Sequence, residues 1–218
     1  MNKSTNGIPQ PGAMARALHV LYDKAVAGIG PQGSAQDVGD SYLRMDGPLD
    51  QQVRRFLRLQ TTKAACLGFV TNCGGAVTLP VALPANVTGT LLIQIRAVAT
   101  VAHMYGYDLH HDAVRTLCFV CLCGNSAKDV LKAGGVQLGN KLAMTAVKRV
   151  PGRVLIQINK RVGFRLVTKL GKTGVVNLGK LVPVAGGLIG GALDGSTMHV
   201  VGRAARSTFN GAPAATAA

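Results

Sequence analysis

The stretch PVAGGLIGGALDG, residues 183–195, decides how the C-terminal part of this chain packs, because five of its thirteen residues are glycine. Its small residues repeat every four positions: Gly187, Gly191 and Gly195, with Gly186 and Gly190 alongside. On a helix, this spacing makes a bare groove that lets another backbone come close. Each glycine costs about 1 kcal/mol relative to alanine in a helix that faces water. We therefore expect a helix that starts at Pro183 and a second element that covers the groove.

Two phosphate-binding motifs are excluded by their spacing. GGLIGG lacks the G-x-G-x-x-G pattern of dinucleotide-binding loops. GKTG, residues 171–174, ends like a P-loop, but Leu166 stands where that motif needs its first glycine, and no strand pattern precedes it. The spacing instead favours a helix that ends with Gly171 as its C′ residue.

Helical periodicity runs through the rest of the chain, and no segment has sustained period-two alternation. The pattern is helical from Pro48 onward, and Asp108 is the expected N-cap of one helix, with Asp112 in its first turn. We predict an all-α fold, a compact multi-helix domain with a central apolar helical hairpin and glycine-rich helix packing. The expected helices span about residues 13–27, 64–78, 85–104, 109–123, 126–150, 152–170 and 183–206.

The apolar hairpin is predicted from an uncharged stretch. Residues 64–95 contain no Asp, Glu, Lys, Arg or His. Because proline ends or kinks a helix, we expect two helices here, joined by LPVALP at residues 79–84. Arg96 makes a stable span of a bilayer costly, which leaves shallow insertion into lipid or burial in the core. The residues that interrupt the stretch are Gly74, Gly75, Pro80 and Pro84.

Composition divides the chain into three regions. Residues 1–47 are expected to be a flexible N-terminal arm with one short helix, which a glycine-rich connector separates from the main body. Residues 48–209 are expected to form the helical domain, and residues 210–218, NGAPAATAA, a disordered tail. The length of 218 residues and the mean hydropathy of +0.27 are sufficient for the chain to form one hydrophobic core.

The net charge of +15 is high and unevenly spread, and all nine acidic residues are Asp. Residues 132–206 hold thirteen Lys and Arg against one acid, Asp194, whereas residues 1–131 hold eleven basic and eight acidic residues. A positive excess of this kind attracts phosphate, either on nucleic acid or on anionic lipid. The absence of Trp counts against a stacking platform for single-stranded nucleic acid.

Within the basic half, one predicted helix carries a cationic ladder. Arg161, Arg165 and Lys169 repeat every four residues, beside an apolar stripe that includes Val162 and Leu166. Adjacent cationic and apolar stripes are typical of a helix that lies at a membrane surface, and they also suit a solvated face above a core face. The candidate membrane- or anion-binding residues are Lys148, Arg149, Arg153, Lys160, Arg161, Arg165, Lys169, Lys172 and Lys180.

Cysteine and histidine patterns give no specific chemistry. Five cysteines, an odd number, without a recognisable signal peptide favour a reducing, cytoplasmic compartment. A structural zinc site usually needs two cysteine pairs, so we predict no metal, no cofactor and no catalytic residue. The candidate metal ligands are Cys118, Cys121 and Cys123 with His103, His110 and His111, and buried thiols are the alternative. His110, His111 and Asp112 are also candidates for a hydrolase, and a polar helix start is the alternative.

Several ordered motifs resemble the bacterial EcsC family. They are GFVTNCGGAVTLPVALPANVTG, LIQIRAVATVAHMYGYDL, GNKLAM, RVGFRL, GVVNLGKLVPVAGGLIGGALDG and VGRAAR, and they cover about residues 53–209. The family is named for a protein encoded beside an ABC transporter. The resemblance implies a cytoplasmic or membrane-associated protein without an established reaction, in which residues 68–84 and 177–194 belong to one helical body.

These observations together lead to an expected function. We expect a non-enzymatic protein at the inner face of the membrane that binds anionic lipid, or a membrane protein such as a transporter, through its basic half and apolar hairpin. A soluble nucleic-acid-binding protein that uses the same basic face is one alternative. A hydrolase of unknown substrate is another. The sequence does not predict an oligomeric state.

Overall fold

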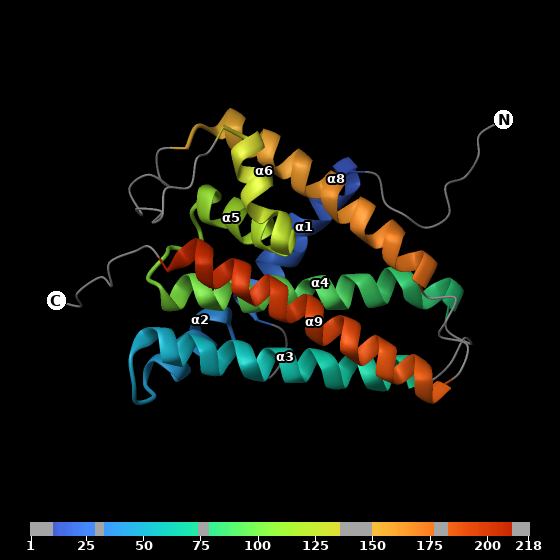
Figure 1. Ribbon diagram of the computed structural model, residues 1–218. Helices are drawn as coiled ribbons and strands as arrows, with labels where there is room; N and C mark the ends of the chain where they lie inside the picture. The colour runs from blue at the N-terminus through green and yellow to red at the C-terminus, as the bar shows by residue number, and fades with distance from the viewer. Residues whose placement is uncertain (1–10, 29–32, 74–78, 136–149, 177–182, 211–218) are drawn as a thin grey trace.

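The computed structural model describes residues 11–28, 33–73, 79–135, 150–176 and 183–210, and within these ranges the fold is all-α (Figure 1). No strand occurs in the described ranges. The α-helices are α1 Pro11–Ala27, α2 Ala35–Leu43, α3 Leu49–Cys73, α4 Leu79–Met104, α5 Asp112–Leu122, α6 Ala127–Ala133, α8 Gly152–Val176 and α9 Pro183–Phe209, with a short 3-10 turn, η3 Gly124–Ser126, before α6.

The core is built around α5 and the second half of α4. Every residue of α5 from Ala113 to Leu122 is buried except Arg115. A helix that is apolar on all sides must be covered on all sides. Helices α4, α6, α8 and α9 pack around α5, and His19 and Tyr22 of α1 contact the ring of Phe119. In Figure 1, α8 runs along one side of the molecule and α3 along the opposite side.

Two long helices, α3 and α9, lie antiparallel along each other. At one end of the pair, Arg206 near the end of α9 forms an ion pair with Asp50 in the first turn of α3. At the other end, α3 finishes where α9 begins. The sequence predicted that the helices over residues 64–78 and 85–104 pair as a hairpin. In the structure, the first of these belongs to α3, which packs mainly against α9 and only in part against α4.

The region expected as an N-terminal arm contributes to the core. Helix α1 buries Leu18, Leu21 and Tyr22 against the body, and the Tyr22 hydroxyl donates a hydrogen bond to the carbonyl of Leu109 (2.9 Å). These apolar side chains recur every three to four residues, so α1 has one face that must be covered. Packing thus continues across the predicted boundary between residues 47 and 48, since α1 and α2 both contact α4.

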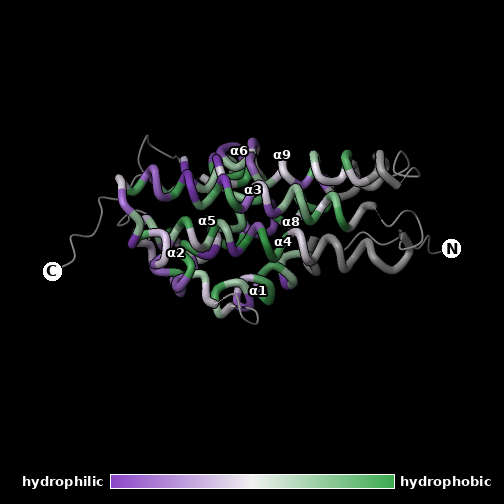
Figure 2. Tube along the Cα trace, turned by 90° about the horizontal axis from the view of Figure 1, so that it is seen from below, coloured by the Kyte–Doolittle hydropathy of each residue, from purple (hydrophilic) through white to green (hydrophobic). Residues whose placement is uncertain are grey.

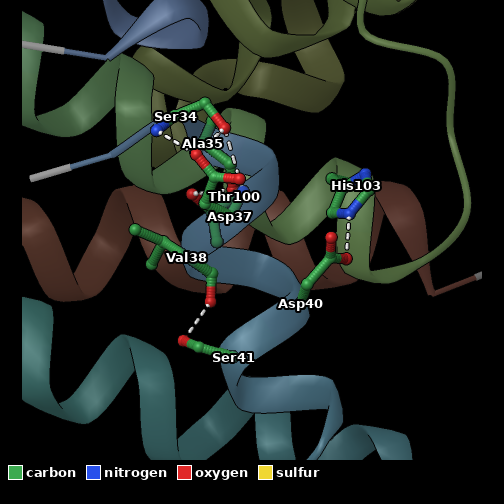
Figure 3. A network of polar contacts seen from close by, with 8 residues as sticks. All are labelled: Ser34, Ala35, Asp37, Val38, Asp40, Ser41, Thr100 and His103. Carbon is green, nitrogen blue, oxygen red and sulfur yellow. Dashed lines mark hydrogen bonds and ion pairs between the residues drawn. The ribbon is translucent and has the colours of Figure 1, made fainter.

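Helix α2 is attached to α4 by polar contacts (Figure 3). Ser34 forms a capping box with Asp37 at the start of α2. The Thr100 hydroxyl donates to the carbonyl of Ala35 (3.2 Å), and Nε2 of His103 lies 2.7 Å from Oδ1 of Asp40. The short loop before α2 is held as well, because Arg96 donates to the carbonyl of Gly33 (2.7 Å).

Two helix starts differ from the sequence prediction. Helix α4 begins at Leu79, so LPVALP is its first part rather than a linker. Pro80 is its second residue, where a missing N–H leaves no carbonyl unpaired. Helix α5 begins at Asp112 and is capped by Nδ1 of His111, which accepts from the backbone N–H of Ala113 (3.2 Å), so the prediction of Asp108 as N-cap was wrong.

Three helix ends differ as well. The helix expected over residues 126–150 is α6, which ends at Ala133 because Gly135 adopts a positive φ of 80°. Residues 136–149 lie outside the described residues. Helix α8 continues to Val176, so the prediction that it ends at Gly171 was wrong, and GKTG lies inside a helix. Helix α9 continues from the predicted Arg206 to Phe209, whose ring is buried against Tyr107. Helix α8 extends past Gly171 because glycine raises the free energy of a helix without ending it. The last turn of α9 is held by the buried ring of Phe209.

Candidate functional site

The glycine groove of α9 is covered by α3. A Cβ atom placed on Gly191 would lie 2.7 Å from the carbonyl oxygen of Ala65, and one on Gly195 would lie 3.0 Å from the Ala65 Cβ. On the facing helix, a Cβ on Gly68 would lie 2.8 Å from the carbonyl oxygen of Gly190. The two backbones therefore touch along a seam of glycine and alanine, which we call the α3–α9 seam. Gly187 and Gly190 are also buried, and the surroundings of Gly186 lie outside the described residues.

The carboxylate of Asp194 is turned towards this seam. Its Oδ2 lies 2.6 Å from the place that a Cβ on Gly68 would occupy, and Asp194 is half-buried. Asp194 is the only acid between residues 132 and 206. Its position leaves the exposed surface of the basic half without a carboxylate among the described residues.

Helix α8 presents a cationic outer face. It contains no acidic residue, and its residues Arg153, Lys160, Arg161 and Arg165 form no ion pair within the described ranges. Its opposite side packs Ile158, Val162 and Leu166 into the core against α1 and α5. Among the side chains of α8 that the structure describes, the exposed cations are Arg153, Lys160, Arg161 and Arg165.

Two large apolar side chains stand among these cations. Ile156 is 57% exposed and Phe164 is 61% exposed. At 3.6 residues per turn, Phe164 falls close to the middle of the exposed arc, with Lys160 and Arg161 one turn before it. We call Arg153, Ile156, Lys160, Arg161, Phe164 and Arg165 the α8 face. Ile156 and Phe164 were not predicted as site residues, because spacing alone does not tell which apolar residues of a helix face the protein.

The structure describes the other predicted basic residues only in part. Lys169 is half-buried on α8, and burial lowers the pKa of its ammonium group. Lys172 falls within α8, but its side chain lies outside the described part of the structure. Lys148, Arg149 and Lys180 lie wholly outside it.

The apolar hairpin residues proposed from the sequence are only partly described. Gly74 and Gly75 fall outside the described residues. Pro80 and Pro84 belong to α4, but their side chains are not described. Within the described ranges, no helix has the length and hydrophobicity that crossing a bilayer requires.

Large apolar side chains are exposed where α3 ends and α9 begins. Val70 is 67% exposed, Leu188 62% and Leu67 48%, and Phe69 and Ile189 are also exposed. Figure 2 shows hydrophobic and neutral residues at this end of the two helices, and hydrophilic residues gathered towards the other end. We call these five residues the apolar end.

The cysteines of α5 are core residues. Cys118 and Cys121 are fully buried and Cys123 is half-buried. Burial raises the pKa of the Cys118 thiol, and it raises that of Cys121 to about 12 and that of Cys123 to about 11. Thiols with raised pKa values stay protonated and are poor nucleophiles and metal ligands. The described residues contain no group of His, Cys and Asp that is suited to hold a metal ion.

The reactivity of these thiols is predictable. In a variant with Cys66 and Cys73 replaced by Ser, we expect a maleimide to label the native protein only slowly, since the remaining thiols are buried or half-buried and protonated. Unfolding in denaturant should expose all three to rapid labelling. In the unchanged chain, the exposed Cys66 should react at once. Rapid native labelling of Cys118 or Cys121 would contradict this assignment.

His110, His111 and Asp112 form the start of α5. Nδ1 of His111 is used by the cap of the helix, and the backbone N–H of His110 donates to Oδ1 of Asp108 (2.9 Å). Asp112 lies in the first turn, where the helix dipole favours a negative charge. These contacts account for the three residues as a helix start.

Comparison with known proteins identifies the family of this chain. No curated protein and no solved structure matches the chain significantly. The sequence profile described as the EcsC protein family matches residues 34–210. The matched region begins at Ser34, the capping residue of α2, and ends just after α9. Because this match covers most of the chain, the protein belongs to the EcsC family.

Proposed function

We propose that this protein is a non-enzymatic component of the inner membrane surface and that it binds anionic lipid through the α8 face. The observation that carries the proposal is the exposure of Phe164 and Ile156 among four cations on a helix without acids. A purely solvated face does not need a phenyl ring at its middle. An interfacial helix does, because its apolar residues enter the boundary between headgroups and acyl chains while its cations contact phosphate.

The magnitudes are sufficient for reversible attachment. Each basic residue near an anionic leaflet contributes about 1 kcal/mol. Four exposed cations on α8 therefore supply about 4 kcal/mol, which is roughly a thousandfold in affinity. Burial of Phe164 and Ile156 in the interface adds an apolar contribution that does not depend on salt.

Vesicle sedimentation tests this function. We expect the protein to pellet with vesicles of phosphatidylglycerol and phosphatidylcholine in equal parts, and to stay in the supernatant with phosphatidylcholine alone. Added salt should weaken the binding without abolishing it, because the cations are screened and the apolar contacts are not. Equal recovery with both kinds of vesicle would refute the preference for anionic lipid, and recovery with neither would refute lipid binding. Recovery only on native membranes would point to a membrane protein as the partner.

A further inference from the structure

The α3–α9 seam has its small residues inside and its large apolar residues outside. Gly68, Gly191 and Ala65 meet at the seam, whereas Val70 and Leu188 are exposed. Helices that pair in water usually bury their large apolar residues against each other. Helices that pair in lipid use small residues at the contact and turn large apolar residues outward, because lipid tails are as apolar as leucine. The end of this pair therefore follows the pattern of helices in lipid.

The charged residues of α3 and α9 lie away from the apolar end. On α3, the last charged residue is Lys63, and no charged residue follows it to Cys73. On α9, no charge precedes Asp194, which is half-buried at the seam. The exposed cations Arg58 and Lys63 on α3 thus border the apolar end, and no exposed acid of the described part of α3 or α9 lies beside it. An apolar tip with a cationic border fits a leaflet with anionic headgroups.

The dimensions also fit. From Lys63 to Val70, the helix rises about 10 Å at 1.5 Å per residue. An interfacial segment reaches about 5–10 Å into the boundary between headgroups and acyl chains. When α3 lies along the bilayer normal and Lys63 is at the level of the phosphates, Val70 and Leu67 lie at the depth of the upper acyl chains.

We infer that the apolar end, Leu67, Phe69, Val70, Leu188 and Ile189, enters the same anionic lipid surface that the α8 face binds. The inference rests on the proposed function and names the part of the chain that goes deepest. Helix α8 descends towards this end of the molecule, where α3 finishes and α4 and α9 begin (Figure 1). One membrane can therefore contact the apolar end and the C-terminal part of the α8 face. Lipid suits the apolar end better than a second copy does, because the exposed side chains lie on both helices of the pair rather than on one flat face.

Tryptophan fluorescence tests the inference directly, because the chain contains no Trp. Four single variants each carry one reporter: V70W and L188W at the apolar end, F164W on the α8 face, and M45W as a control. Met45 is 42% exposed in the loop between α2 and α3, at the opposite end of α3. All four positions are exposed, so the fold should tolerate the ring, and far-UV circular dichroism checks this.

The expected result uses vesicles of phosphatidylglycerol and phosphatidylcholine in equal parts, with brominated acyl chains as quenchers. Emission of V70W and L188W should shift to the blue and be quenched at least as strongly as that of F164W, while M45W should not change. Quenching of F164W without quenching of V70W and L188W would overturn the inference and leave the α8 proposal intact. No sedimentation and no quenching of any variant would refute both. A blue shift of V70W that grows with protein concentration and needs no lipid would assign the apolar end to a second copy, and so overturn the inference.

Discussion

Charge reversal at Arg161 and Arg165, in the variant R161E/R165E, is expected to weaken binding to anionic vesicles by roughly a thousandfold. Each lost cation removes about 1 kcal/mol of attraction, and each new carboxylate adds repulsion of similar size, about 4 kcal/mol in total. Both side chains are exposed, and neither forms an ion pair within the described structure. Arg165 donates only a long, exposed hydrogen bond to the Ser126 hydroxyl (3.4 Å), so the fold should lose little stability. Sedimentation over a series of lipid concentrations measures the change in affinity.

A matched variant separates a local effect from an effect of net charge. R16E/R44E changes the net charge by the same amount, at exposed residues of α1 and the end of α2. We expect it to weaken binding less, because neither residue belongs to the α8 face that contacts the lipid. An equal loss of affinity in the two variants would show that the whole basic protein, and not this face, is attracted to the membrane.

Phe164 distinguishes lipid from nucleic acid as the ligand of the α8 face. F164S should weaken vesicle binding at high salt, where the apolar contribution dominates. It should leave the stability nearly unchanged, because the ring is exposed. If the basic face instead serves duplex DNA or RNA, a mobility shift should fall steeply with salt and be insensitive to F164S.

The fold class was predictable because helical periodicity and glycine spacing are local properties of the sequence. Gly187, Gly191 and Gly195 indicated a close helix contact, and the structure has that contact. The identity of the covering helix did not follow from the spacing. A small-residue stripe shows that some backbone comes near, but any helix with a matching small face satisfies it. Ala65 and Gly68 of α3 provide that face.

Helix bounds were less predictable, because single residues only bias the chain. Pro80 and Gly171 were both read as breaks, yet α4 starts before the first and α8 runs past the second. A proline in the first turn lacks only an N–H that would have no partner there. A glycine inside a helix costs about 1 kcal/mol, which tertiary packing offsets.

Among the candidate binding residues, the sequence predicted exposed cations on α8 but not the exposed apolar residues beside them. Arg161 and Arg165 are exposed on α8, as the ladder indicated. The apolar stripe of Ile158, Val162 and Leu166 packs into the core instead of facing a membrane. The exposed apolar residues are different ones, and periodicity alone cannot identify them because it does not tell which of two apolar sets faces the protein.

Substitution at Gly191 is expected to cause the largest loss of stability. In G191L, the side chain begins 2.7 Å from the backbone oxygen of Ala65 and 3.3 Å from Phe69, so α3 and α9 must separate. Overpacking of this kind costs about 3 kcal/mol. G191A should cost less, about 1 kcal/mol, because the gain in helix propensity offsets part of the clash. Urea unfolding followed by far-UV circular dichroism measures the free energy of unfolding.

Gly89 provides the matched control. It also lies within a helix, α4, but a Cβ at this position has no atom within 4 Å. G89A should therefore raise the free energy of unfolding by about 0.5–1 kcal/mol, since alanine loses less conformational entropy than glycine on folding. The same substitution thus has opposite signs at two helical glycines, and the contact with α3 alone makes the difference. Stabilisation by G191A equal to that by G89A would mean that the α3–α9 seam opens freely. Close packing against α3 would then not explain the glycines of α9.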